Sequence, residues 1–147
     1  MSAHILVDTN ILLLLMQPLH PHSSVARSAV TKLRNGGQEL WASPQNLVEC
    51  WVVATRPLSV NGFGMPPARA AAELQAIHGF LRVLEGQPGV AAAWEALVRK
   101  HSVSGKQAHD AHLVAVMQVY GVTGILTFNV ADFRRYPGIQ VLDPAQF

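Results

Sequence analysis

Short, almost continuously apolar runs alternate along this chain with longer segments that carry helix start and stop signals, and this alternation constrains the fold most strongly. Runs without a polar face are typical of strands covered on both sides, which are mostly parallel strands joined by crossover helices. The predicted strands are residues 4–7, 40–42, 82–84, 124–127 and 140–142. The chain is therefore expected to form an α/β fold around a mostly parallel sheet.

The segments between these strands are expected to be helices. Ser43 is followed by Pro44, which gives an N-cap and a proline at the first helical position, and Pro57 ends the helix that begins there. Ser23 or Ser24 is predicted to cap another helix. The expected helices are residues 11–16, about 23–34, 44–55, 67–81, 90–101, 107–120 and 130–136. Residues 58–67 are predicted to be the one long irregular stretch.

The length and composition favour one compact domain over residues 1–147. Half of the residues (50%) are hydrophobic, which is enough to bury a large core. Only 14% are charged, below the typical ~25%. Apolar surface is expected to remain once one core is filled, which predicts a homodimer or another protein partner. The net charge of +2 permits a nucleic-acid partner without arguing for one.

No part of the sequence predicts export or membrane insertion. The first apolar stretch has no basic region before it and is interrupted at residues 8–10. Residues 11–16 are too short to span a bilayer. Cys50, the only cysteine, lies in a largely apolar run and is expected to be a core residue in a reducing compartment. The protein is therefore expected to be soluble and cytoplasmic.

Four of the nine acidic residues stand where an α/β fold gathers functional groups. Asp8 ends the first predicted strand, and Asp132 follows the fourth. Asp110 lies near the start of the helix between them, and Glu49 has to point inward from an apolar helix. In an open parallel sheet, the carboxyl ends of the strands and the helix starts that follow them converge on one crevice. The four carboxylates are therefore expected to form one cluster.

Carboxylates gathered in one crevice repel each other, and a divalent cation removes that repulsion. Oxygen ligands favour Mg²⁺ or Mn²⁺, and zinc is less favoured because no His or Cys stands at a matching position. Taken alone, Asp8 is explained equally well as a helix N-cap and Asp110 as a first-turn acid. Glu49 and Asp132 alone fit a solvated helix face. Their combination at one edge of the sheet favours a metal site.

The ordered motifs are Val7-Asp8-Thr9-Asn10, Glu49 in its apolar helix, His109-Asp110-Ala111-His112-Leu113-Val114-Ala115, and Leu126-Thr127-Phe128-Asn129 through Asp132-Phe133. This set resembles PIN-domain ribonucleases, and among them the VapC toxins of bacterial toxin–antitoxin pairs. The resemblance runs over nearly the whole chain. It implies an α/β/α sandwich, cleavage of RNA that depends on Mg²⁺ or Mn²⁺, and a cognate antitoxin protein as partner.

On this pattern the acidic quartet is Asp8, Glu49, Asp110 and Asp132. The resemblance implies that Asp8, Asp110 and Asp132 bind the metal directly or through water. It also implies that Glu49 holds a metal or orients the attacking water. Supporting hydrogen bonds to the carboxylates or to a substrate phosphate are expected from Thr9, Asn10, Thr127 and Asn129. Some relatives carry a further Asp at the position of Asn129, so one potential ligand is missing here.

Other polar residues carry weaker indications. His109 and His112 lie three apart on one helix without a third ligand, which favours local hydrogen bonding or RNA contact over metal binding. His20 and His22 flank a turn proline and are not expected to bind metal. Candidates for RNA phosphate contacts near the crevice mouth are Arg56, Lys106, Arg134 and Arg135. Trp41 and Trp51 are expected to pack in the core.

Three other functions stay open. A haloacid dehalogenase-type phosphatase also uses an Asp after its first strand, but it needs a second Asp where this chain has Asn10. A catalytically silent RNA- or protein-binding module fits the fold but not the retention of four acids. A solitary RNA-processing nuclease would share the chemistry and lack an antitoxin. A small open reading frame immediately upstream of the gene would favour the toxin.

Overall fold

The computed structural model describes residues 4–147 and contains one five-stranded sheet. The strands are β1 (His4–Val7), β2 (Glu39–Ala42), β3 (Arg82–Val83), β4 (Gly124–Leu126) and β5 (Gln140–Leu142). They lie in the order β3-β2-β1-β4-β5, and each pair of neighbours is parallel. The predicted parallel sheet is confirmed, with β1 at its centre.

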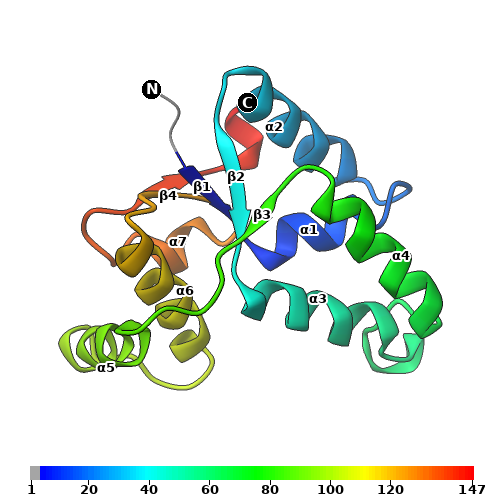
Figure 1. The fold of residues 1–147 in the computed structure, drawn as a ribbon. Coiled ribbons are helices and arrows are strands. Elements are labelled where there is room, and N and C mark those ends of the chain that lie inside the picture. Colours follow the sequence, from blue (N-terminus) through cyan, green and yellow to red (C-terminus); the bar gives the residue numbers. More distant parts are fainter. Residues whose placement is uncertain (1–3) are drawn as a thin grey trace.

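Helices cover both faces of this sheet. They are α1 (Thr9–Leu15), α2 (Ser23–Asn35), α3 (Pro44–Thr55), α4 (Pro67–His78), α5 (Val90–Lys100), α6 (Gln107–Tyr120) and α7 (Val130–Phe133), with short 3-10 turns η1 (Leu58–Val60) and η2 (Pro144–Gln146). Figure 1 shows α5, α6 and α7 on one side of the strands and α1, α3 and α4 on the other. The predicted α/β/α sandwich is confirmed. Among the described residues, no helix combines the length and apolarity needed to cross a membrane.

The apolar runs of the strands supply two separate cores. Successive side chains of a strand point to opposite faces, so Ile5 and Val7 pack with α1, α2 and α3, whereas Leu6 packs with α6. On β4, Leu126 joins the first core and Ile125 joins the second. Because both faces are buried, neither strand has a polar face. This explains why the runs are apolar at every position.

Several element ends differ from the sequence predictions. Helix α1 begins at Thr9, two residues before the predicted start, because the Asp8 carboxylate accepts a hydrogen bond from the Thr9 backbone N–H at 2.8 Å. The predicted serine cap of α2 is wrong: its N-cap is His22, and the Ser23 hydroxyl donates to the Leu14 carbonyl instead. Ser43 is the N-cap of α3, as predicted, and its N–H donates to Asn46 Oδ1.

The stretch predicted to be irregular contains η1 and then runs back along the end of α3. The Phe63 N–H donates to the Val53 carbonyl at 2.9 Å, and the Met65 N–H donates to the Ala54 carbonyl at 2.8 Å. Gly62 makes this path possible, because a Cβ at that position would lie 1.9 Å from the Arg56 carbonyl oxygen. The loop thereby holds Phe63 against the first core.

Candidate active site

Asp8 lies at the carboxyl end of the central strand and is almost entirely buried, with 5% of its surface exposed. Its Oδ1 accepts the Thr9 N–H, and its Oδ2 accepts the Thr127 hydroxyl at 2.8 Å. Thr127 itself follows β4, the neighbouring strand, so the two strand ends hold the carboxylate from both sides. Asp8 therefore caps α1, and the same hydrogen bonds fix the orientation of its carboxylate.

Asn10 and the segment after β4 extend this arrangement. The Asn10 amide nitrogen donates to Thr127 Oγ1 at 3.2 Å and lies 3.5 Å from Asp8 Oδ2. Its carbonyl oxygen accepts the Phe128 N–H at 3.3 Å. The Asn129 backbone N–H donates to Thr127 Oγ1, and the Asn129 residue is exposed. Predicted support from Asn10 and Thr127 is thus present in the geometry, and Asn129 contributes a backbone donor.

Glu49 points inward from α3 toward these residues. Its Oε2 accepts the Thr9 hydroxyl at 2.8 Å, and the Thr9 hydroxyl oxygen accepts the Asn46 amide at 3.0 Å. Its Oε1 accepts the Gln45 amide nitrogen at 2.7 Å. The side chain is half-buried. A residue that by itself fits a solvated helix face is therefore turned toward the strand ends and held there by two hydrogen bonds.

Gln45 is a residue that the sequence analysis missed. Besides Glu49, its amide nitrogen donates to the His109 carbonyl at 3.1 Å, and its carbonyl oxygen lies 2.6 Å from His112 Nδ1. An amide oxygen only accepts, so His112 Nδ1 carries the proton in this contact. The sequence left local hydrogen bonding or RNA contact open for His112; the structure shows a hydrogen bond within the protein, but to a residue 67 positions away. The spacing of Gln45 and Glu49, four residues apart on one helix, is the one indication in the sequence that pointed to this pair.

The charges of the four acids are coupled. Burial raises the pKa of Asp8 above its usual range, hydrogen bonds from Thr127 and Thr9 oppose this, and the negative charges of Glu49 and Asp132 add to the rise. Burial likewise raises the pKa of Asp110 to about 6, with further contributions from Asp8, Asp132 and Glu49. Glu49 and Asp110 line one groove together with Thr9, the residue after Asp8, and Asp132 on α7 is near enough for its charge to act on both Asp8 and Asp110. The catalytic and metal-binding roles of the four acids stay predictions.

These residues fit a magnesium or manganese ion by their donor type. Across residues 4–147, no three His, Cys, Asp or Glu side chains stand close enough together to enclose an ion by themselves. Mg²⁺ does not need such a cage, because it keeps several waters and is usually bound through one or two carboxylates. The pKa of both Asp8 and Asp110 is raised by burial first and by neighbouring negative charge second, and a bound cation would stabilise the ionised form of each.

A groove of about 490 Å³ opens beside these acids and is called here the carboxylate groove. Its lining consists of Thr9, Val48, Glu49, Val52, Val53, Arg56, Lys106, His109 and Asp110. Two of the four basic residues considered for RNA contact, Arg56 and Lys106, therefore lie in it. Arg135 is engaged elsewhere: it donates to the Gln107 side chain and to the His101 carbonyl.

The remaining candidates are structural. Cys50 is buried, and burial together with the nearby acids raises the pKa of its thiol to about 12, which excludes a reactive thiolate near neutral pH. The His22 backbone N–H donates to His20 Nδ1 within their turn. Trp41 and Trp51 are half-buried, and each packs against one of the two cores. These observations agree with the core roles expected for the cysteine and the tryptophans.

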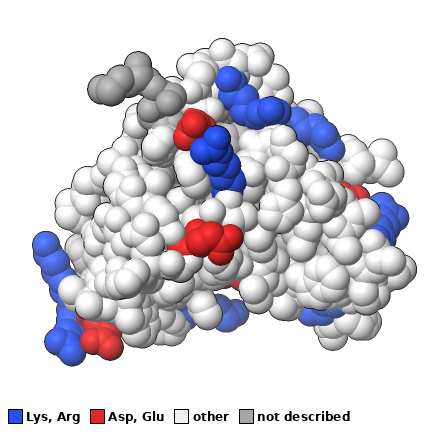
Figure 2. Space-filling model, in the orientation of Figure 1, with Lys and Arg blue, Asp and Glu red and all other residues white. Residues whose placement is uncertain are grey.

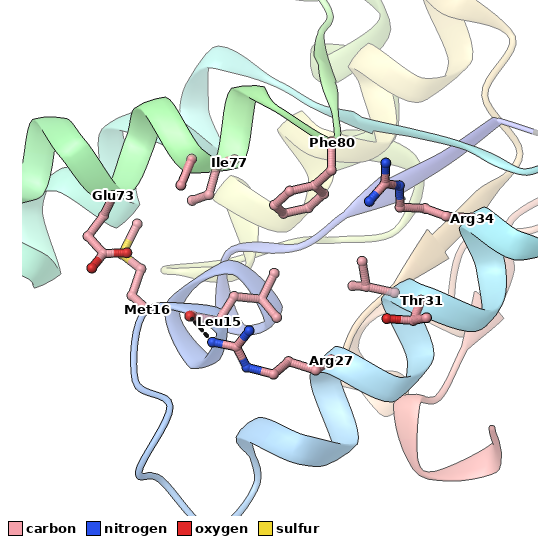
Figure 3. Close-up of a pocket in the computed structure, with 10 residues that line it drawn as sticks. Leu15, Met16, Arg27, Thr31, Arg34, Glu73, Ile77 and Phe80 are labelled. Carbon is pink, nitrogen blue, oxygen red and sulfur yellow. Dashed lines mark hydrogen bonds between the residues drawn. The ribbon is translucent and has the colours of Figure 1, made fainter.

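A second groove, of about 470 Å³, lies between α2 and α4 and is called here the α2–α4 groove. Figure 3 shows Leu15 and Met16 at the end of α1, with Ile77 and Phe80 above them and arginines on the α2 side. Arg27 donates to the Leu15 carbonyl at 3.0 Å.

Figure 2 shows that charged side chains are sparse over the pictured face of the molecule. No lining residue of the α2–α4 groove lines the carboxylate groove.

Several solved structures that resemble this chain are bacterial toxin–antitoxin complexes or toxins. The chain is similar to VapBC2 from Rickettsia felis bound to a promoter DNA fragment, with a TM-score of 0.70, 11% identity and coverage of 95% of this chain and 98% of that one. It is similar to DNA-bound VapBC from Salmonella typhimurium, with a TM-score of 0.68, 23% identity and coverage of 98% of this chain and 99% of that one. It is also similar to Mycobacterium tuberculosis VapC20, a sarcin-ricin loop cleaving toxin, with a TM-score of 0.58, 24% identity and coverage of 82% of this chain and 86% of that one.

No curated protein matches the chain significantly. The model of the PIN domain family matches residues 5–139, which span the sheet from β1 to the turn before β5 and include all four acids. The chain therefore belongs to the PIN domain family.

Proposed function

We propose that this protein is an endoribonuclease that depends on Mg²⁺ or Mn²⁺ and acts as the toxin of a toxin–antitoxin pair. The observation that carries the proposal is the convergence of acids beside the end of β1: Thr9 joins Asp8 to Glu49 by hydrogen bonds, and Glu49 and Asp110 line the same groove. Membership in the PIN domain family and the similarity to a toxin that cleaves the sarcin-ricin loop support it. Asp8 also caps α1, but like charges gathered at this position repel each other, and a bound divalent cation would remove that repulsion.

Asp8, Asp110 and Asp132 would hold the ion. When bound, a divalent ion neutralises charge on the scissile phosphate and lowers the pKa of water. Asp8 is fixed for this role by the Thr127 hydroxyl and the Thr9 N–H, so it needs no rearrangement before binding. Glu49 keeps unused acceptor positions on both oxygens, since each accepts one hydrogen bond from the protein, and these would orient the attacking water.

The RNA backbone would lie in the carboxylate groove. Lys106 is exposed at its rim, and Arg56 lines it while donating to the Asn61 carbonyl at 3.0 Å. These cations would contact phosphates next to the one that is cleaved, which keeps the polyanion beside four negative side chains. RNA binding is therefore expected to weaken as salt concentration rises.

Two surfaces suit the protein partners that we propose. The α2–α4 groove combines an apolar floor at Met16, Ile77 and Phe80 with exposed Arg27 and Arg34, which fits an amphipathic antitoxin segment that carries acidic residues. A second exposed apolar surface comprises Val48 and Val52 on α3, which also line the edge of the carboxylate groove, and Leu58 and Val60 of η1; these residues are 62%, 48%, 77% and 52% exposed. An apolar patch complements itself across a two-fold axis, so we place the homodimer interface there.

The activity is tested with purified protein, a structured RNA and either metal. Cleavage is expected with Mg²⁺ or Mn²⁺ and is expected to disappear in excess EDTA and in Asp8→Asn. Glu95→Gln, an exposed acid on α5, serves as the matched control and should cleave like the wild type. Cleavage that persists at full rate in EDTA or in Asp8→Asn would contradict the metal-nuclease proposal.

The partner surface is tested separately by co-expression with the product of an adjacent upstream reading frame. Ala76 lines the α2–α4 groove, whereas Ala71 is exposed on α4 outside it. Ala76→Arg should fill the groove and abolish neutralisation of growth inhibition, while its RNA cleavage stays at the wild-type level. Ala71→Arg should still be neutralised. Equal neutralisation of both variants would remove the groove as the antitoxin surface.

A further inference from the structure

An apolar pocket of about 430 Å³ lies on the α1 side of the acids and has no role in the proposed cleavage. We call it the Phe63–Phe128 pocket; its lining is Asn10, Leu13, Leu14, Gln17, His22, Phe63 and Phe128. None of these residues lines the α2–α4 groove or the carboxylate groove. The pocket is therefore a separate hollow, distinct from the surfaces assigned above to the partner and the RNA backbone.

The pocket is continuous with the carboxylates through Asn10. The Asn10 amide nitrogen lies 3.5 Å from Asp8 Oδ2, and its carbonyl oxygen accepts the Phe128 N–H at 3.3 Å. Phe128 directly follows Thr127, whose hydroxyl donates to the same Asp8 oxygen. One side chain, Asn10, thus separates the interior of the pocket from Asp8, the carboxylate that we propose as a metal ligand.

The lining has the chemistry that an unpaired nucleobase needs. Phe63 and Phe128 are both half-buried, and each offers an aromatic surface from a different loop. The ring centroids of His22 and Phe128 lie 6.4 Å apart, so a third aromatic ring stands beside them. Gln17 and Asn10 supply amides at the edge. Apolar faces with a few hydrogen-bonding groups at the rim are how proteins hold bases that are unstacked from single-stranded RNA.

We propose that the Phe63–Phe128 pocket holds one unpaired nucleobase of the RNA, on a nucleotide next to the cleaved phosphate. This inference rests on the proposed function and adds the position at which the substrate is read. The carboxylate groove and the pocket share no lining residue but meet the acids at Thr9 and Asn10, respectively. A single strand that crosses Asp8 would place phosphates in the groove and a base in the pocket.

The test uses Asp8→Asn as the parent, so that the RNA stays intact, and short single-stranded oligoribonucleotides with 2-aminopurine at successive positions. Stacking quenches this base, so quenching is expected at one position near the cleavage site. Phe128→Leu and Phe63→Leu remove the rings but keep apolar volume, and each should lower affinity roughly tenfold and abolish the quenching. Phe147→Leu, at an exposed phenylalanine that lines neither groove nor the pocket, is the matched control and should change neither.

Phe128→Tyr, which keeps the ring, should retain both affinity and quenching, and circular dichroism checks that each variant is folded. Unchanged affinity and quenching in both leucine variants would overturn the inference while wild-type cleavage with Mn²⁺ leaves the proposed function intact. Leucine variants that bind RNA normally but escape the antitoxin would also overturn it, because the pocket would then belong to a protein partner. Absence of any cleavage by the wild type would refute the proposed function itself.

Discussion

The Gln45 amide nitrogen donates to Glu49 Oε1 at 2.7 Å, one turn away on the same helix. The Gln45 carbonyl oxygen is in turn fixed by His112 Nδ1 on α6 at 2.6 Å. Because the Gln45 amide accepts a hydrogen bond from α6 and donates one within α3, the positions of its oxygen and nitrogen are fixed. The orientation of Glu49 on α3 is therefore coupled to α6, the helix that carries Asp110.

Gln45→Met is expected to lower the rate of RNA cleavage about tenfold, corresponding to ~1.4 kcal/mol of transition-state stabilisation. Methionine keeps the length of the side chain but cannot donate to Glu49, so the carboxylate loses one of its two hydrogen bonds. Because Gln45 acts through Glu49, kcat should fall while KM stays close to its wild-type value. Gln75→Met, at an exposed position on α4, should leave both constants unchanged.

The metal-free protein is expected to lose stability as the pH rises. Burial raises the pKa of Asp110 to about 6 in the folded chain, against 3.8 for an ordinary aspartate, so between these values the folded state binds more protons than the unfolded state. The free energy of unfolding therefore decreases across this window and changes little above it. The raised pKa of Asp8 acts in the same direction.

Denaturant unfolding at a series of pH values, in EDTA, measures this effect for the wild type and for Asp110→Asn. The difference between the two unfolding free energies isolates Asp110 from all other titrating groups. Relative to Asp110→Asn, the wild type should be more stable at pH 4 than at pH 6. A difference that does not vary with pH would contradict the raised pKa.

The sequence was sufficient to predict the layers and the position of the acids, because both follow from local rules. A strand that is apolar after its first residue has to be covered on both faces, and Asp8 comes directly after such a strand, residues 4–7. The carboxyl ends of parallel strands share one edge, so Asp8 and Thr127 were expected near each other. Their 2.8 Å hydrogen bond follows from the pairing of β1 with β4.

What the sequence could not predict depends on which helices lie side by side. Gln45 contacts His112, 67 residues further along, and no local pattern reports that α3 faces α6 at this point. The same reason explains the wrong cap for α2: the Ser23 hydroxyl donates to the Leu14 carbonyl, which only the tertiary fold brings within reach. Ser23 prefers by itself to cap the helix, but here its hydroxyl bonds the end of α1 instead.

The homodimer proposal predicts that Leu58→Lys produces a monomer. Leu58 is 77% exposed beside Val60 and after the exposed valines of α3, so a charge there would be buried without a partner in the interface. Light scattering at micromolar concentration should report a dimer for the wild type and half that mass for the variant. Leu19→Lys, at a 98% exposed leucine in the turn after α1, should remain dimeric. A wild-type monomer would contradict the proposal.

Asp8→Asn is expected to abolish cleavage and at the same time to stabilise the metal-free protein. The substitution keeps the size of the side chain and its hydrogen-bonding capacity, but it removes a negative charge that is buried and that repels Glu49 and Asp132. With one repulsive charge fewer, the melting temperature in EDTA should rise by a few degrees, since ~1 kcal/mol corresponds to about 2–4 °C for a domain near this size.

Added Mg²⁺ or Mn²⁺ should then raise the melting temperature of the wild type more than that of Asp8→Asn. A ligand that binds only the folded state stabilises it in proportion to its occupancy, and the variant lacks a charge that the ion needs. Glu95→Gln again serves as control and should respond to metal like the wild type. Equal metal-induced shifts in the wild type and in Asp8→Asn would show that the ion binds away from Asp8. The assignment of this carboxylate as a ligand would then be wrong, even if the variant no longer cleaves RNA.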